Sequence, residues 1–182
     1  MRAPVLAYRR VYRDAIAGLQ EGLKRNATTM RRFGESYLYD QSYTHRPGAY
    51  VILRRGDRLL LTIQEGFDGL PPELQLPGGG VDPGESPIPA MHREVIEETG
   101  WKMRLECKLG AYRRFTYMPE YELWAEKVCH IYLGTPTFRI GDPTETGHVP
   151  IWLPIDLAIE ELTNSGDRAF TAALFDSRRM PF

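Results

Sequence analysis

Residues 78–101 read GGGVDPGESPIPAMHREVIEETGW and combine a glycine-rich loop with a segment that carries three glutamates. Ser86 belongs to the residue types that cap helix N-termini, and the proline after it suits the first helical position. Gly100 is a favourable helix stop, because glycine adopts the left-handed conformation without a steric penalty. The sequence therefore predicts a helix over residues 87–99.

The three glutamates of this helix, Glu94, Glu97 and Glu98, are spaced so that all three project from one face. Neighbouring carboxylates repel one another, and Arg93 can pair with only some of them. A bound cation would remove that repulsion, and a cluster of oxygen ligands selects a hard divalent ion such as Mg²⁺ or Mn²⁺. An ordinary solvated helix face is the alternative interpretation. The glycines just upstream favour the metal site, because their backbone can approach a ligand closely.

The rest of the chain alternates between strand and helix patterns. Residues 49–54 and 58–64 flank a Gly56-Asp57 turn and predict a β-hairpin. Further strands are expected over residues 104–117 and 126–133, and further helices over residues 156–162 and 167–178. Because strands and helices mix without regular alternation, we expect an α+β domain with layers on a sheet.

Residues 1–46 are predicted to form an extension ahead of a main domain at residues 47–182. Apolar residues recur every three or four positions in the extension and predict an amphipathic helix over about residues 10–25. Residues 1–40 hold 8 basic and 4 acidic side chains. We expect the helix to pack on the main domain or across a homodimer, and a nucleic-acid or membrane arm is the alternative.

Composition and charge exclude several classes of protein. The chain of 182 residues has 23 basic and 24 acidic side chains, a balance that argues against a dedicated nucleic-acid coat protein. Its apolar runs are too short to span a bilayer, and no secretory signal is visible, so we expect a cytoplasmic protein without a membrane partner. Cys107 and Cys129 lack the spacing of a zinc site or a disulfide framework.

The spacing of the central motif can now be compared with known families. Gly79, Glu85, Arg93-Glu94, Glu97-Glu98 and Gly100-Trp101 stand in a register that resembles the Nudix box at every defined position. The resemblance implies a Nudix-like α/β/α sandwich with a mixed sheet. It also implies a hydrolase that uses Mg²⁺ or Mn²⁺ to cleave a nucleoside diphosphate linked to another group.

The same resemblance implies roles for the residues of the box. Glu94, Glu97 and Glu98 would bind the metal or supply the general base, and the backbone carbonyl of Gly79, or of its neighbour Gly78, would add a ligand. Arg93 would belong to the catalytic set by orienting the helix together with Glu85. Glu97 and Glu98 are both expected at the protein surface.

Nudix enzymes often add a carboxylate from a loop that precedes a tryptophan at the start of the last core strand. Residues 143–152 resemble that segment, and Glu145 is the candidate for the extra metal ligand or base, with Asp142 as a second choice. Glu120 and Glu122 are the alternatives.

Three histidines are interpreted mainly as structural residues. His130 and His148 are each expected to be hydrogen-bonded packing residues, and a role as base or substrate contact is the alternative. His92 lies on the box helix and is expected to point away from the glutamates.

Candidate substrate contacts follow the predicted strand at residues 104–117. Arg113, Arg114, Tyr117 and Tyr121 offer the aromatic planes and cations that bind a nucleobase and phosphates. The substrate class stays open between nucleoside triphosphates and nucleoside diphosphates joined to a sugar or second nucleotide. A catalytically inactive, nucleotide-binding domain is disfavoured because every box glutamate is present. The near-neutral charge disfavours RNA as a substrate.

Overall fold

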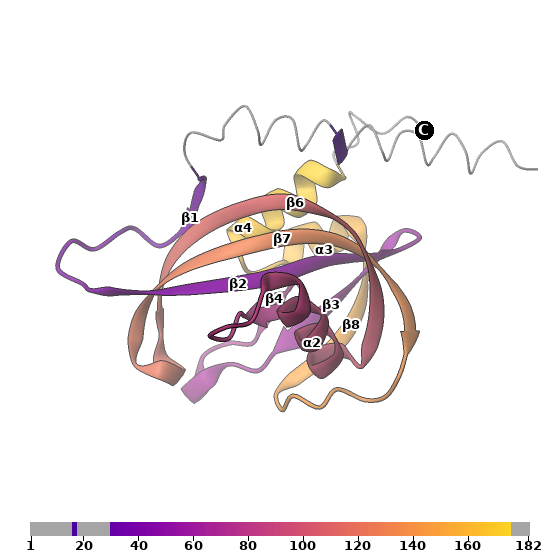
Figure 1. The fold of residues 1–182 in the computed structure, drawn as a ribbon, viewed down its shortest axis with the longest axis horizontal. Helices are drawn as coiled ribbons and strands as arrows, with labels where there is room; N and C mark the ends of the chain where they lie inside the picture. Colours follow the sequence, from indigo (N-terminus) through magenta and orange to yellow (C-terminus); the bar gives the residue numbers. More distant parts are fainter. Residues whose placement is uncertain (1–15, 18–29, 176–182) are drawn as a thin grey trace, which may run out of the picture.

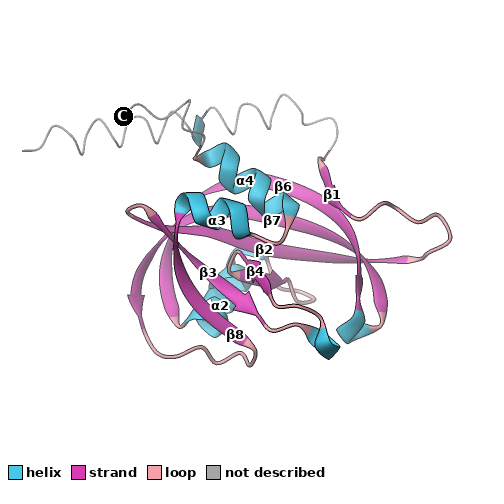
Figure 2. Ribbon diagram, turned by 180° about the vertical axis from the view of Figure 1, so that it is seen from behind, coloured by secondary structure: helices cyan, strands magenta, loops and turns pink. Residues whose placement is uncertain are grey.

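The computed structural model describes residues 16–17 and 30–175, and its centre is a mixed sheet with helices on both faces (Figures 1 and 2). The strands are β1 (Arg32–Gly34), β2 (Tyr43–Arg55), β3 (Arg58–Gln64), β4 (Glu73–Gln75), β5 (Gly78–Gly80), β6 (Trp101–Met118), β7 (Leu123–Arg139) and β8 (His148–Pro154). The helices are α2 (Pro87–Thr99), α3 (Ile155–Glu161) and α4 (Ser165–Leu174). The predicted α+β class with a mixed sheet is therefore confirmed.

The sheet runs in the order β1-β6-β7-β2-β3-β4, with β5 paired to β2 and β8 paired to β3. The predicted hairpin is confirmed, because β2 and β3 are antiparallel and join through the Gly56-Asp57 turn. β2 also lies parallel to β7 from Tyr43 to Leu53. This parallel pairing brings the start of the first long strand beside a strand some 80 residues later in the chain.

Strand β2 is covered on both faces, which explains its continuous apolar sequence. Ala49, Val51 and Leu53 pack with residues of α2 in one buried cluster. Tyr50 and Ile52 point the other way and pack into a second cluster with residues of α3 and α4. The alternation of side chains along one strand thus builds both cores of the three-layer domain.

The predicted helix at residues 87–99 is confirmed as α2. Gly100 ends it in the left-handed conformation, with φ 71°, although the Ser86 side chain makes no capping hydrogen bond. The strands β6 and β7 are longer than expected, because their antiparallel pairing continues from Trp101↔Arg139 to Met118↔Leu123. Long-range pairing of this kind extends strands beyond what local sequence indicates.

The amino-terminal region is described only in part. Of the helix expected over residues 10–25, only Ile16 and Ala17 are described, and both are helical; the rest lies outside the described residues, as does the end of the last predicted helix. β1 pairs in parallel with β6. The region before residue 47 therefore adds an edge strand to the sheet, and the domain boundary at residue 46 stays a prediction.

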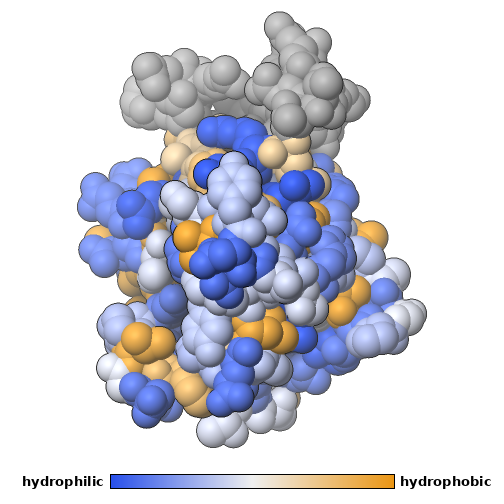
Figure 3. Space-filling view, turned by 90° about the vertical axis from the view of Figure 1, so that its left-hand side faces the viewer, coloured by the Kyte–Doolittle hydropathy of each residue, from blue (hydrophilic) through white to orange (hydrophobic). Residues whose placement is uncertain are grey.

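The helices and the exposed aromatic side chains of the described residues bear on possible membrane and ligand contacts. None of their helices is long and apolar enough to cross a membrane. Exposed aromatic side chains occur near the β1–β2 connection and the turn after β6, at Tyr37, Tyr39, Tyr117 and Tyr121. The face seen in Figure 3 mixes apolar and hydrophilic patches among the described residues.

Candidate active site

Arg93 connects the carboxylates of the box into one network. Its Nη1 atom donates hydrogen bonds to Glu94 Oε1 at 2.8 Å and Glu97 Oε2 at 3.0 Å. Its Nη2 atom lies 3.1 Å from Glu85 Oε2. These bonds raise the pKa of Arg93, and its hydrogen bond to Glu85 lowers the pKa of that carboxyl. Arg93 thereby holds two glutamates of the helix in fixed positions.

Glu98 is buried, which corrects the expectation that it lies at the surface. Its residue is only 2% exposed, because α2 packs this side of the helix against β5 and β8. The Gly78 amide donates to Glu98 Oε2 at 3.0 Å, and His148 Nδ1 lies 3.3 Å from Oε1. Burial raises the pKa of Glu98 well above its ordinary value. Glu97 remains partly exposed at the surface.

The glycines of β5 leave space that side chains would fill. β5 pairs antiparallel with β2, which places Gly79 beside the Glu94 carboxylate. A Cβ atom on Gly79 would lie 2.6 Å from Glu94 Cδ, closer than real Cβ atoms approach. Gly78 has φ 132°, a conformation that favours glycine. Both positions therefore need glycine for the carboxylates to lie where they do.

Glu145 reaches the box through a loop that docks on the end of α2. The amides of Thr144 and Glu145 both donate to the carbonyl oxygen of Glu97, at 2.8 and 3.0 Å. Helix-end carbonyls lack partners within the helix, so they are free to bind this loop. The Asp142 side chain bonds to Arg139 instead. Of the two candidates in this loop, Glu145 is therefore the one beside the carboxylates.

Two sets of potential metal ligands share Glu145. Glu94, Glu97 and Glu145 form the first set, and Glu98, Glu145 and His148 form the second. Within each set one ligand atom from every residue lies within 4.8 Å of the others. Oxygen-rich sets of this kind suit hard divalent cations.

His148 lies in this cluster, a position that the sequence did not favour. It is buried, and its Nδ1 atom lies 3.3 Å from the hydroxyl of Thr62 on β3. Its Nε2 atom lies 3.7 Å from Glu145 Oε1. Burial lowers the pKa of His148. In the sequence, the only sign that His148 joins the site was its position three residues after Glu145. The pairing of β3 with β8 was needed to show that its side chain lies beside the carboxylates.

His130, His92 and the remaining acidic candidates lie outside both ligand sets. His130 faces α2 from β7 and is half-buried, with no hydrogen-bond partner for Nδ1 among the described residues. His92 is half-buried on α2. Glu120 is one of the residues that line the cavity described in the next paragraph. Glu122 lies two residues later in the turn between β6 and β7, with φ 50°.

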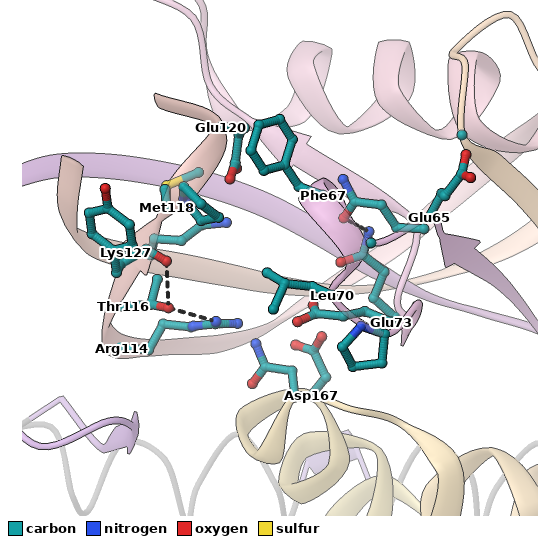
Figure 4. Close-up of a pocket in the computed structure, with 18 of the residues that line it drawn as sticks. Glu65, Phe67, Leu70, Glu73, Arg114, Thr116, Met118, Glu120, Lys127 and Asp167 are labelled. Atoms are coloured by element: carbon teal, nitrogen blue, oxygen red, sulfur yellow. Dashed lines mark hydrogen bonds between the residues drawn. The ribbon is translucent and has the colours of Figure 1, made fainter. Parts of the chain in front are cut away.

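A cavity of about 580 Å³ adjoins the cluster. It reaches Thr146 and Gly147, which lie between Glu145 and His148 in the chain. Figure 4 shows Arg114, Thr116 and Lys127 along one side of it and Phe67, Leu70 and Glu73 along the other. The cavity thus extends from the loop between Glu145 and His148 across the face of β6 and β7.

The four predicted substrate contacts separate into two pairs. Arg114 and Tyr117 line the cavity. Arg113 points to the opposite face of β6, where its Nε atom lies 3.0 Å from Glu126 Oε1. The ring of Tyr121 packs against the Arg46 guanidinium, whose Cζ atom lies 4.7 Å from the ring centroid. The cavity also contains Lys127 and the buried Asp167, which sequence reasoning did not select because their strand and helix positions carry no motif.

Comparison with known proteins identifies the family. A family model described as NUDIX domain matches residues 44–174. The chain belongs to the Nudix family. The family predicted from the box is therefore confirmed.

Two curated Nudix relatives illustrate the range of named activities. The putative 8-oxo-dGTP diphosphatase of Bacillus subtilis is 37% identical over 102 residues, which are 54% of this chain and 60% of that protein. The CMP-5'-(N-acetyl-N-hydroxy-3-aminopropyl)phosphonate hydrolase of Streptomyces rubellomurinus is 31% identical over 127 residues, 68% of this chain and 59% of that protein. The matched part thus spans about 60% of the length of each relative.

Solved Nudix structures share the fold. A Nudix hydrolase from Nitrosomonas europaea has a TM-score of 0.59 at 24% identity, covering 76% of this chain and 94% of that one. The MutT protein from Methanosarcina mazei Go1 has a TM-score of 0.59 at 21% identity, covering 76% and 98%. At these identities the likeness shows the fold alone.

Proposed function

We propose that this Nudix hydrolase cleaves a pyrophosphate bond in a nucleoside diphosphate linked to another group, with Mg²⁺ or Mn²⁺ held by the box carboxylates. The observation that supports this most strongly is that Glu145, from a distant loop, completes two ligand sets beside the box helix. A solvated helix face would not need a buried Glu98 or a loop docked on the helix end. A catalytically inactive domain is disfavoured because Glu85, Glu94, Glu97 and Glu98 are all present.

The donor atoms of the cluster fit a hard divalent ion. Glu94, Glu97 and Glu145 supply oxygen atoms only, and Glu98 with His148 adds one nitrogen. We place the Gly79 carbonyl in the same ligand group. A bound ion would withdraw charge from the phosphate oxygens and lower the pKa of a coordinated water.

The protein's own side chains would position the ligands and move the proton. Arg93 fixes Glu94 and Glu97 through its paired hydrogen bonds. The Gly78 amide fixes one oxygen of Glu98 and leaves the other facing His148. Glu145 is exposed and directly precedes Thr146, which lines the cavity, so we assign it as a metal ligand or as the group that accepts the proton of the attacking water.

The cavity supports a nucleotide derivative as substrate. Phe67 supplies an aromatic ring, and Arg114 supplies a cation, among the groups that line it. The two relatives above are named for a nucleoside triphosphate and a nucleoside monophosphate conjugate, so both open substrate classes remain candidates. A cytoplasmic location, a possible homodimer and the absence of a nucleic-acid partner stay predictions.

Product release from a panel of nucleoside triphosphates, ADP-ribose, nucleotide sugars and dinucleoside polyphosphates tests the proposal. We expect hydrolysis of one class with Mg²⁺ or Mn²⁺ and none with chelator. Glu97→Gln should lower turnover at least about tenfold, which corresponds to about 1.4 kcal/mol of lost transition-state stabilisation. Glu160→Gln, on the exposed side of α3, is the matched control. Activity that survives chelator, or a normal rate for Glu97→Gln, would contradict the metal role.

A further inference from the structure

Two cations, Arg114 and Lys127, line the cavity side by side, and neither belongs to the box. Arg114 on β6 and Lys127 on β7 are directly opposite in the antiparallel register. Residues in this relation project from the same face of a sheet, and like charges placed so destabilise the pair. Arg46 of β2 is the next residue in the row, opposite Lys127.

Neither cation of the pair forms a close ion pair with a described residue. Among the described residues no carboxylate oxygen lies within 4.0 Å of Arg114 or Lys127. The Arg114 Nε atom is buried without a hydrogen-bond partner, and Nη2 has only a long bond of 3.4 Å to the hydroxyl of Thr116. Lys127 contacts Tyr50, whose ring centroid lies 5.8 Å from Nζ. A buried donor without a partner is costly, so the site lacks an acceptor.

The neighbouring carboxylates do not supply that acceptor. Asp167 is buried in the same cavity, and the charges of Arg114 and Lys127 both lower its pKa, but its hydrogen bonds come from the Tyr112 hydroxyl at 2.8 Å and the Leu76 backbone. Four glutamates also line the cavity, and all four are exposed to solvent: Glu35, Glu65, Glu73 and Glu120. Solvent screens charges at the rim, whereas a ligand at the half-buried cations would be screened less. The wall formed by β6 and β7 therefore has a surplus of donors.

We infer that Arg114 and Lys127 form a second anion subsite, which binds a phosphoryl or carboxylate group of the substrate other than the pyrophosphate that is cleaved. Guanidinium and ammonium groups bind both anions through charge-assisted hydrogen bonds. The inference rests on the proposed function for the position of the pyrophosphate at the carboxylate cluster. The cavity that holds the cation pair is also lined by Thr146 and Gly147, the two residues between Glu145 and His148, so one substrate could extend from the pair to the cluster. The substrate class is then a nucleoside diphosphate derivative with an additional anionic group.

Binding of simple anions tests the subsite without any hydrolysis. The full chain is unfolded thermally with chelator present, in inorganic phosphate, in acetate and in chloride of equal ionic strength. We expect phosphate or acetate to raise the Tm of the wild type relative to chloride, and the one that does so identifies the anion. Arg114→Gln and Lys127→Gln should lose the increase, and Arg114→Lys should keep part of it.

Arg113→Gln is the matched control, because Arg113 is the adjacent arginine on the same strand but faces Glu126 outside the cavity. Its Tm increase should equal that of the wild type. Without anions, Arg114→Gln should have a Tm close to that of the wild type, because the substitution breaks no close ion pair with a described residue. An equal Tm in all three salts, or an increase that persists in Arg114→Gln, would overturn the subsite.

Hydrolysis of matched substrates then tests the substrate class. UDP-glucuronate is compared with UDP-glucose, and the 2′-phosphate of ADP-ribose with ADP-ribose, each with Mg²⁺. We expect the more anionic member of one pair to have a kcat/KM about tenfold higher, mainly through KM, with the difference lost in Arg114→Gln. Equal kcat/KM within both pairs would overturn the assignment. If nothing is hydrolysed, the proposed function fails, while the Tm results still decide the subsite.

Discussion

At the scale of single residues, two buried carboxyl groups, those of Glu98 and Asp167, have pKa values raised by their surroundings. Glu98 belongs to one of the two candidate ligand sets, and Asp167 lines the cavity while it accepts the Tyr112 hydroxyl. Burial is the main reason that the pKa of each group is raised, and for Asp167 it rises from 3.8 to about 6. Both carboxyls therefore hold a proton more readily in the folded state than in the unfolded chain.

Asp167→Asn should change how stability depends on pH. Because the folded protein binds the Asp167 proton more tightly, the free energy of unfolding should fall as the pH rises from about 4 to about 6 and then level off. The shift in pKa corresponds to a fall of about 3 kcal/mol from this group. Urea unfolding at pH 4, 5, 6 and 7 should show a smaller fall in Asp167→Asn. Asp156→Asn, an exposed residue, should follow the wild type; parallel curves for all three proteins would refute the assignment to Asp167.

At the scale of elements, the site depends on how α2 packs against β5 and the loop before β8. β5 is a three-glycine strand that lets the Glu94 side chain lie against the backbone of Gly79. The loop binds the last turn of α2 through two hydrogen bonds to one carbonyl, that of Glu97. Each contact places one carboxylate, so small changes at these two junctions should affect activity more than stability.

Gly79→Ala tests this packing, because the new Cβ would lie 2.6 Å from Glu94 Cδ. The carboxylate must move away, and a displacement of about 1 Å in an active site can lower the rate roughly a hundredfold. We expect turnover to fall at least about tenfold in steady-state assays, with unfolding near that of the wild type. Gly80→Ala is the control, since its Cβ would meet nothing within 4 Å. Equal rates for both variants would show that Glu94 need not lie where it does.

At the scale of the whole molecule, the fold brings together candidate metal ligands from segments far apart in the chain. α2 follows β5, whereas Glu145 and His148 arrive some 50 residues later through the long β6–β7 hairpin. Bringing these carboxylates together costs free energy that a cation would offset. The folded state should therefore bind the metal, and the unfolded chain should not.

Divalent metal should accordingly stabilise the protein. Mg²⁺ or Mn²⁺ at a hundred times its dissociation constant should add about 2.7 kcal/mol to the free energy of unfolding, seen as a higher Tm. Glu97→Gln should reduce this gain because one ligand is lost, and Glu160→Gln should not. A Tm that is the same with metal and with chelator would show that the clustered carboxylates do not hold an ion.

The sequence by itself determined the features that depend on near neighbours. The helix at residues 87–99, its glycine stop and the hairpin at Gly56-Asp57 follow from capping, left-handed glycine and turn chemistry, which act over a few residues. The common face of Glu94, Glu97 and Glu98 follows from the helical repeat. The spacing of these local features was also sufficient to indicate the family.

Only the tertiary structure decided which side chains meet across the sheet. The burial of Glu98, the place of His148 and the separation of Arg114 from Arg113 depend on the register of β3 with β8 and of β6 with β7. A shift of one residue in either pairing would move these side chains to the opposite face, and nothing near them in the sequence specifies that register. The loop of Glu145 likewise depends on the carbonyl of Glu97, which is available only after α2 has formed and packed.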